Sequence, residues 1–409
     1  MRKDTQILNL GRIAALLLGL ACAASAQAGG TEAYTGDRPQ SVATADFNAD
    51  GMPDLAVVNM NDDNVGVLLN TTASGSPDIS LAAEQTFATG NMPIAAAAAD
   101  VNGDGKPDLI VVNCGDATVT VLINTTVPGS STVSFTAGDT FAVGNTPIWV
   151  MAADLNGDGR VDIVTTNVTS SSLSVLLNTT SNGSSTAAFD ADQELLVGQM
   201  PNAVVAVDVN GDGLPDLATA NYLDNTVSVL LNGTATGSDT VSFADQQLFA
   251  AGNGPQSIAT GDINGDGLPD LVVVGGNDNT VAVLLNITVA SSTTVGFADQ
   301  QIFYAANSSQ SVVIRDVNGD GLADVIVANE DGSDVALLVN TTATGSATAG
   351  FLDEQDFARS LGGGLTSVAA IDMNGDGLPE LVAVNTNTDD VSVLLNATAP
   401  GDTTLDFIP

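Results

Sequence analysis

The feature that most constrains the fold is a nine-residue acidic segment that recurs seven times along the chain. Its copies occupy residues 46–54, 100–108, 154–162, 208–216, 262–270, 316–324 and 372–380, so the spacing is 54 residues five times and then 56. Repetition at a fixed period is typical of solenoids, propellers and other arrays of one supersecondary unit. The chain is therefore expected to consist of seven copies of one such unit.

Each repeat has the pattern of four short strands separated by turn residues. A strand of small and β-branched residues, such as 257–260, precedes the acidic segment, and an apolar strand, such as 109–112, follows it. A third strand, such as 227–231, ends at an Asn, and a hairpin rich in Thr, Ser and Gly leads to a fourth strand that carries a Phe, such as 135–143. No window shows helical periodicity. The sequence therefore predicts an all-β fold, a seven-bladed β-propeller with four antiparallel strands per blade.

The two ends of the repeat region complement each other. The seventh unit stops part-way into its fourth strand, within residues 404–409, whereas residues 33–36 align with the fourth-strand residues 87–90. A fourth strand shared between the two ends would close the ring and leave no free sheet edge. We therefore expect a single seven-bladed propeller over residues 32–409, with a shared N- and C-terminal closing strand.

The first 28 residues have the composition of a secretory leader. A basic start with Arg2, Lys3 and Arg12 precedes an apolar run over residues 13–21, and small residues follow at 24–26 and 28. This run is shorter than the roughly 20 apolar residues that a membrane-spanning helix needs. The sequence predicts a signal peptide over residues 1–28 and an exported protein without a membrane span, located outside the cell, on its surface or in the periplasm.

Composition excludes several functions. The chain has 8 Lys and Arg, 48 Asp and Glu and no His, a formal net charge of −40. The absence of His removes imidazole-based catalysis and His-ligated zinc. The negative charge excludes nucleic acid and anionic membranes as partners, because both are bound by Lys and Arg. A glycosidase needs two carboxyl groups across a cleft, and no sequence feature identifies such a pair, so we expect no enzymatic activity.

The acidic segment has the pattern Asp-x-Asn-x-Asp-Gly-x-x-Asp, numbered here as positions 1 to 9, and it predicts a calcium site. Calcium binds several oxygen ligands, which the side chains at positions 1, 3, 5 and 9 and the backbone carbonyl at position 7 can supply. Asp, Asn and Gly are also ordinary turn residues, but three acids in each of seven loops repel one another unless a cation neutralises them. We expect up to seven Ca²⁺ ions, one per blade, in the loop between the first and second strands.

The seven loops offer the same set of ligands, except that the last carries Glu at position 9. Gly at position 6 permits the sharp turn that brings the ligands together. An EF-hand would also need a Glu at position 12, where these segments have an apolar strand residue. The expected ligands are Asp46, Asn48, Asp50, Met52 and Asp54; Asp100, Asn102, Asp104, Lys106 and Asp108; Asp154, Asn156, Asp158, Arg160 and Asp162; Asp208, Asn210, Asp212, Leu214 and Asp216; Asp262, Asn264, Asp266, Leu268 and Asp270; Asp316, Asn318, Asp320, Leu322 and Asp324; and Asp372, Asn374, Asp376, Leu378 and Glu380.

With these motifs the chain resembles the FG-GAP/VCBS repeat proteins, bacterial relatives of the integrin α-subunit β-propeller. The resemblance covers residues 32–409 and rests on the acidic segments, on Phe-x-x-Gly-x-x-Pro segments such as 87–93 and 141–147, and on Leu-Leu-Asn-Thr-Thr strand ends. It implies a seven-bladed propeller with calcium in hairpin loops between the first and second strands of its blades. The Phe-Gly segment departs from the family pattern at Leu195, Ala306 and Ser360. No second integrin-type domain follows, so receptor signalling is not implied.

Four further features have competing interpretations. Trp149, the single Trp, occupies a first-strand position where the other repeats have a small residue, and it either stacks on a sugar or plugs the central channel. Arg315 either contacts a ligand or offsets the local negative charge. Cys114 is expected to be an incidental thiol. Seven Asn-x-Thr sequons permit glycosylation, but an Asn that ends a strand and hydrogen-bonds its own turn is the favoured interpretation. The sequon residues are Asn70, Asn124, Asn178, Asn232, Asn286, Asn340 and Asn396.

These features predict an exported, calcium-binding propeller that acts as a non-enzymatic binding or adhesion module. We expect a monomer whose ligand is a protein or a glycan. A lectin-like, carbohydrate-binding propeller is the alternative, and a polysaccharide-active enzyme is a third interpretation. Repeated lectin sites usually need one aromatic residue each, whereas aromatic residues make up 4% of this chain and none recurs at an exposed position. A single ligand site near Trp149 remains compatible with the sequence.

Overall fold

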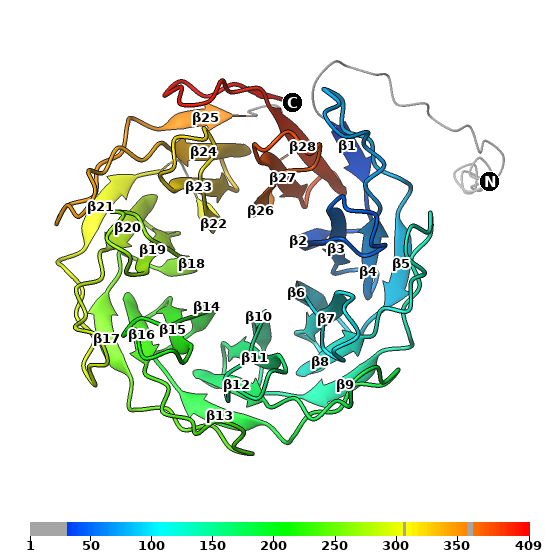
Figure 1. Cartoon of the computed structure of the whole chain (residues 1–409), viewed down its shortest axis with the longest axis horizontal. Coiled ribbons are helices and arrows are strands. Elements are labelled where there is room, and N and C mark those ends of the chain that lie inside the picture. The colour runs from blue at the N-terminus through cyan, green and yellow to red at the C-terminus, as the bar shows by residue number, and fades with distance from the viewer. Residues whose placement is uncertain (1–30, 306–307, 358–362) are drawn as a thin grey trace, which may run out of the picture.

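The computed structural model describes residues 31–305, 308–357 and 363–409. These residues form a ring of seven sheets, and each blade consists of four antiparallel strands (Figure 1). The all-β, seven-bladed propeller expected from the repeat is therefore confirmed. The signal peptide expected over residues 1–28 and the motif departures at Ala306 and Ser360 lie outside the described residues. Within the described ranges, no helix is long and apolar enough to cross a membrane.

Strands follow one another outward in each blade, from an inner strand near the ring axis to an outer strand at the rim (Figure 1). The first three blades are β2 (Pro39–Ala45), β3 (Asp54–Asn59), β4 (Asn64–Leu68) and β5 (Gln85–Ala88); β6 (Pro93–Ala99), β7 (Asp108–Asn113), β8 (Thr118–Leu122) and β9 (Asp139–Ala142); and β10 (Pro147–Ala153), β11 (Asp162–Asn167), β12 (Ser172–Leu176) and β13 (Gln193–Leu196). The next three are β14 (Pro201–Val207), β15 (Asp216–Asn221), β16 (Thr226–Leu230) and β17 (Gln247–Ala250); β18 (Pro255–Gly261), β19 (Asp270–Gly275), β20 (Thr280–Leu284) and β21 (Gln301–Tyr304); and β22 (Ser309–Arg315), β23 (Asp324–Asn329), β24 (Asp334–Leu338) and β25 (Gln355–Phe357).

The seventh blade combines both ends of the described chain. Its inner strands are β26 (Leu365–Ile371), β27 (Glu380–Asn385) and β28 (Asp390–Asn396), and both β1 (Thr31–Tyr34) and β29 (Phe407–Ile408) pair with β28. The register pairs Thr31 with Val393 in one segment and Asn396 with Phe407 in the other. Two short segments from opposite ends of the chain thus occupy successive parts of one outer-strand position.

The hydrophobic core lies between the blades. Second strands such as β3 and β7 are buried along their whole length, which is why their sequences are continuous apolar runs rather than alternating ones. In the first seam, Val58 and Val65 of blade 1 pack in one cluster with Leu109 and Val111 of blade 2, and all four are fully buried. Burial of one such side chain contributes about 1.5–3 kcal/mol, so each seam is a substantial source of stability.

The Phe-x-x-Gly-x-x-Pro segment joins one blade to the next. Phe87 of β5 contacts Phe135 of the following blade edge to face, with ring centroids 4.9 Å apart. The Gly90 N–H donates to Oδ1 of the buried Asn113 at 3.0 Å, and a Cβ at Gly90 would lie 2.7 Å from Cγ of Asn113. Glycine is required here because of this close approach. The fourth strand is shorter than expected, since Phe135 forms only an isolated bridge before β9 begins.

Candidate metal sites in the acidic loops

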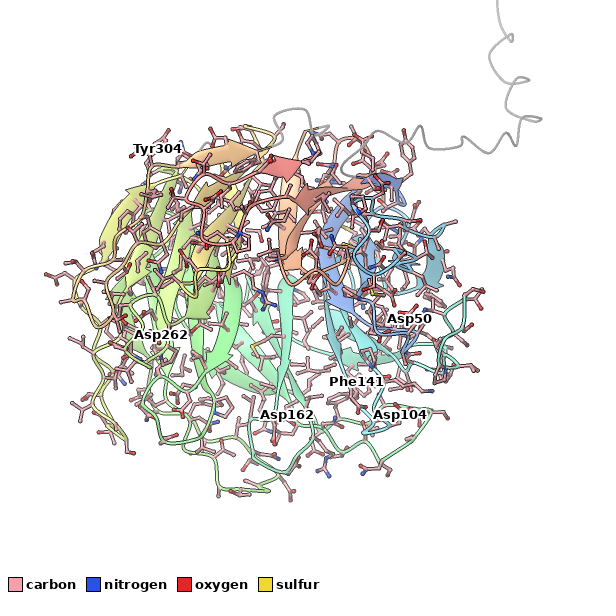
Figure 2. The ribbon with its side chains drawn as sticks, turned by 45° about the horizontal axis from the view of Figure 1, so that its top comes forward. Asp50, Asp104, Phe141, Asp162, Asp262 and Tyr304 are labelled. Carbon is pink, nitrogen blue, oxygen red and sulfur yellow. The ribbon has the colours of Figure 1, made fainter. Side chains whose placement is uncertain are left out.

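Each acidic loop connects the inner strand of a blade to its second strand, as expected from the sequence. In blade 1 the loop begins after β2, and position 9 is Asp54, the first residue of β3. Because every blade has the same strand order, the seven loops lie at the same end of their blades. Figure 2 labels one acid from the loops of blades 1, 2, 3 and 5, spread around the ring.

Inside a loop, the side-chain oxygens of positions 1, 3 and 5 point inward. In blade 1, Asp46 accepts hydrogen bonds from the backbone N–H groups of Asp50 at 3.1 Å and Gly51 at 2.8 Å. Oδ1 of Asn48 accepts a second bond from Asp50 N at 3.1 Å, and Oδ1 of Asp50 accepts one from Met52 N at 2.9 Å. Gly51 has φ of 93°, a conformation that strongly favours glycine. The side chains of positions 1, 3 and 5 therefore all accept hydrogen bonds from backbone N–H groups of one turn.

Position 9 has a structural role that the sequence did not reveal. Asp54 is fully buried, and its two carboxylate oxygens accept hydrogen bonds from Phe47 N and Asn70 N, both at 2.8 Å. Burial raises the pKa of Asp54 to about 7, the two backbone bonds oppose this, and repulsion from Asp50 and Asp46 adds to it. The pKa of Glu380 is likewise raised to about 7, mainly by burial. The pKa is raised to about 6 at Asp108, Asp162, Asp216, Asp270 and Asp324.

Every acidic loop is also held by the neighbouring blade. Nδ2 of Asn48, at position 3, donates to the carbonyl of Ser130 at 3.1 Å, and Gly129 N donates to the carbonyl of Asn48 at 2.6 Å. Residues 129 and 130 belong to the hairpin between β8 and β9 of blade 2, so a hairpin of one blade clasps the loop of the preceding blade. The same backbone bond joins Gly183 to Asn102, Gly237 to Asn156, Ser291 to Asn210, Gly345 to Asn264, Gly401 to Asn318 and Gly75 to Asn374.

The sequon asparagines form a second set of bonds across the seams. Asn178 is buried, and its Nδ2 donates at 2.9 Å to the carbonyls of Val101 in blade 2 and Val161 in its own blade. Its Oδ1 accepts from Thr180 N at 2.8 Å, which is the turn bond expected from the sequence. Nδ2 of Asn178 therefore donates two hydrogen bonds inside the folded protein. The equivalent bonds to the preceding blade come from Asn70, Asn124, Asn232, Asn286, Asn340 and Asn396.

The donor set of a loop suits calcium. It contains only oxygen donors, namely three carboxylates, one amide oxygen and the carbonyl of position 7, and hard cations bind such donors. In this structure the loop carboxylates accept hydrogen bonds from backbone N–H groups. Across residues 31–305, 308–357 and 363–409, no three acidic or Cys side chains lie close enough together to form a metal site as they stand. The side-chain oxygens of positions 1, 3 and 5 accept hydrogen bonds from backbone N–H groups of the same loop, so these potential donors belong to one short turn.

The remaining candidate residues do not come together in one site. Trp149 is half-buried near the start of β10 and packs against the core clusters of the adjoining blades. Arg315 is exposed and is the last residue of β22. The two residues lie three blades apart and at opposite ends of their inner strands. Cys114 lies in the turn between β7 and β8, where burial raises the pKa of its thiol, so it is less reactive than an ordinary Cys.

The fold and these loops define a seven-bladed β-propeller with an acidic loop at every blade seam. The chain belongs to the FG-GAP-like repeat family, whose model matches residues 46–111, 100–165, 208–273, 265–327 and 316–383. The sequence matches none of the curated proteins with which it was compared. The family resemblance drawn from the repeats is therefore confirmed.

Solved structures share the fold at low sequence identity. A crystal structure of BBS1N in complex with ARL6DN is 15% identical, with a TM-score of 0.56, and the match covers 91% of this chain and 96% of that chain. Virginiamycin B lyase from Staphylococcus aureus is 9% identical, with a TM-score of 0.51 and coverage of 89% and 98%. A protein from Lactobacillus plantarum is 18% identical, with a TM-score of 0.50 and coverage of 77% and 84%. At these identities the likeness concerns the fold alone.

Proposed function

We propose that this protein is an exported, calcium-binding propeller that acts as a non-enzymatic binding or adhesion module. The observation that carries the proposal is the clasp between each acidic loop and the hairpin of the next blade. An ion held in the loop would fix position 3, whose amide and carbonyl also bind that hairpin. Calcium in the loops would therefore stiffen the seams of the whole ring, and a rigid ring presents its surface loops as a preorganised binding face.

The calcium ligands would be the residues at positions 1, 3, 5, 7 and 9 of each loop. In blade 1 these are Asp46, Asn48, Asp50, the carbonyl of Met52, and Asp54. Bound calcium would neutralise the mutual repulsion of the three carboxylates. The carboxylate at position 9 already accepts hydrogen bonds from two backbone N–H groups. As a calcium ligand it would keep these bonds, so the start of the second strand would stay in place.

A binding role is favoured over catalysis for two reasons. Most of the carboxylates that recur in register along the sequence are those of the acidic loops, where metal coordination would occupy them. A variant of the lyase with a similar fold, lacking one histidine, is described as catalytically inactive, and this chain contains no His. BBS1N, in contrast, is a propeller of similar shape in a complex with another protein. A polysaccharide-active enzyme remains the less favoured proposal.

The ligand is proposed to be a protein or a glycan. Among the described residues, the large aromatic side chains that are mostly exposed are Tyr34 and Tyr304, on the outer strands of blades 7 and 5. They do not form a ring of equivalent stacking sites, so a lectin with one sugar site per blade is disfavoured. The leader over residues 1–28 supports export to the extracellular space, the cell surface or the periplasm.

The proposal is tested by screening the mature chain against a glycan array and against immobilised extracellular and periplasmic proteins, in 1 mM calcium and in excess chelator. A binding module should capture a partner in calcium and lose most of this affinity in chelator. Light scattering of the free protein should give the mass of a monomer. Turnover of a polysaccharide, or binding that is equal with and without calcium, would contradict the proposed function.

A further inference from the structure

The acidic loop of blade 3 differs from the other six. In six loops the carboxylate at position 5 is exposed, whereas in blade 3 the side chain of Asp158 is only 12% exposed. The residue that covers it is Arg160, at position 7 of the same loop. Arg160 and Asp158 form the single ion pair found across the described ranges, with Nη2 of Arg160 2.5 Å from Oδ2 of Asp158.

The guanidinium of Arg160 is held at two points. Its Nη2 donates to Asp158, and its Nε donates to the backbone carbonyl of Asn178 at 2.7 Å. Asn178 is a buried residue two positions beyond the end of β12, and it bonds across the seam to blade 2. The guanidinium of Arg160 therefore lies between the carboxylate of Asp158 and the backbone carbonyl of Asn178. Planar guanidinium groups are well suited to such double contacts.

Position 7 in the other blades provides a comparison. Four blades carry Leu at this position, and blade 1 carries Met. Blade 2 carries Lys106, which has the same charge as Arg160 but forms no ion pair with any described residue within 4.0 Å. Leu378 of blade 7 instead extends across the seam and approaches Gly319 in the loop of blade 6. Among the described loops, the return of a cationic side chain onto its own loop occurs only in blade 3.

We infer that blade 3 carries its own cation, so that its loop holds its shape without calcium and binds calcium more weakly than the other six loops. The inference rests on the proposed calcium role. A guanidinium on Asp158 removes one of the three free negative charges of the loop, and the affinity of calcium loops depends on ligand charge. It also places a positive charge next to a site for a divalent cation. At a separation of about 5 Å this repulsion weakens binding by about tenfold, even at the dielectric constant of water.

A second consequence concerns the seam between blades 3 and 4. The clasp of the blade 3 loop is formed by Nδ2 of Asn156 with the carbonyl of Ser238 at 3.1 Å and by Gly237 N with the carbonyl of Asn156 at 2.8 Å. If Arg160 supports the loop, this clasp persists when calcium is removed. The equivalent clasp in blade 1, at Gly129 N, has no such support and should open first.

The main test is a calcium titration by calorimetry and by competition with a chromophoric chelator, on the wild type, Arg160→Leu and Lys106→Leu. Leu is already the residue at position 7 in four blades, and Lys106→Leu removes the same charge from a loop without the contact. We expect six sites of similar affinity and one at least about tenfold weaker in the wild type. Arg160→Leu should bring the seventh site into the strong class. Lys106→Leu keeps the backbone carbonyl that position 7 would offer to the ion and removes a side-chain charge that makes no ion pair, so it should change the affinity of its own site much less than Arg160→Leu does.

Any of four results would overturn the inference. Seven equivalent sites in the wild type, or a weak site that persists in Arg160→Leu, refute the role of Arg160 while leaving the proposed calcium function intact. An equal effect of Lys106→Leu shows that net charge, and not the contact with Asp158, sets the affinity. Absence of calcium binding in all three proteins refutes the proposed function, and the inference with it.

Hydrogen exchange gives an independent readout that needs no calcium. In excess chelator the wild-type amide of Gly237 should exchange more slowly than that of Gly129, and Arg160→Leu should abolish this difference. Equal exchange of the two amides in the wild type would contradict the inference even if the variant failed to fold.

Discussion

Replacement of a sequon asparagine tests the role of the seam bonds. In Asn178→Ala the buried side chain loses two bonds from Nδ2, to the carbonyls of Val101 and Val161, and one bond from Thr180 N to Oδ1. All of these groups lie in or beside a blade seam, and the shorter Ala side chain leaves them without the Asn178 partner. We therefore expect a large loss of stability from the removal of one small polar side chain.

The magnitude follows from the number of bonds. A buried hydrogen bond contributes about 1 kcal/mol net, and a partner left unpaired costs more, so three lost bonds should cost about 3 kcal/mol or slightly more. With an unfolding entropy of about 2.1 cal/mol/K per residue, a propeller of roughly 380 residues loses about 4 °C in Tm for this change. Differential scanning calorimetry of the wild type and the variant measures the shift.

Asn182→Ala is the matched control, because Asn182 is exposed in the same hairpin. This change should shift the Tm by less than 1 °C, as expected for about 0.5 kcal/mol or less. Equal shifts in the two variants, or an unchanged Tm for Asn178→Ala, would refute the view that sequon asparagines tie blade to blade. Retained stability with a glycan attached at Asn178 would refute it as well.

Three further predictions concern the ring, the loops and Trp149. Deletion of residues 404–409 removes β29 and exposes part of the β28 edge to pairing with another molecule. We therefore expect less cooperative melting and concentration-dependent association, measured by light scattering. A deletion variant that stays monomeric and melts like the parent would contradict this prediction. Folding raises the pKa of the position 9 acids to about 6–7, so in chelator the protein takes up protons on folding, and its Tm should rise as the pH falls from 7.5 to 5. In calcium the Tm should instead fall as the pH falls, because protons compete with the ion for these carboxylates. The same dependence of Tm on pH in calcium and in chelator would contradict this prediction. Trp149→Ala should cost about 2–3 kcal/mol, less than for a fully buried Trp, and an unchanged Tm would show that its ring does not pack between blades.

The sequence predicted the architecture well because the repeat is almost exact in length. A second strand that is apolar at every position, as in β7, must be covered on both faces, and neighbouring blades are the only repeated units available to cover it. The acidic segment was placed correctly between the first and second strands, since it separates a strand of small residues from an apolar run.

The contacts between blades could not be read from the repeat. Asn48 looks like a simple loop ligand in the sequence, yet its amide and carbonyl bind a hairpin about 80 residues further along the chain. Asp54 looks like a ligand alone, yet it anchors two backbone N–H groups. A period shows which positions are equivalent, but it does not show which positions of neighbouring units meet in space. The contact of Arg160 was also hidden, because a single variation at position 7 gives no sign of where its side chain points.

The most direct measurement of the calcium role is the thermal unfolding of the mature protein in excess chelator and in 1 mM calcium. Extracellular calcium modules bind with Kd of about 10⁻⁴–10⁻³ M, so 1 mM calcium contributes about 0.4–1.4 kcal/mol per occupied site and about 3–10 kcal/mol over the ring. For a propeller of this size that corresponds to a Tm higher by about 4–12 °C, and magnesium should restore little of the difference. Melting curves that coincide in calcium and in chelator would contradict a ring stiffened by calcium at its seams.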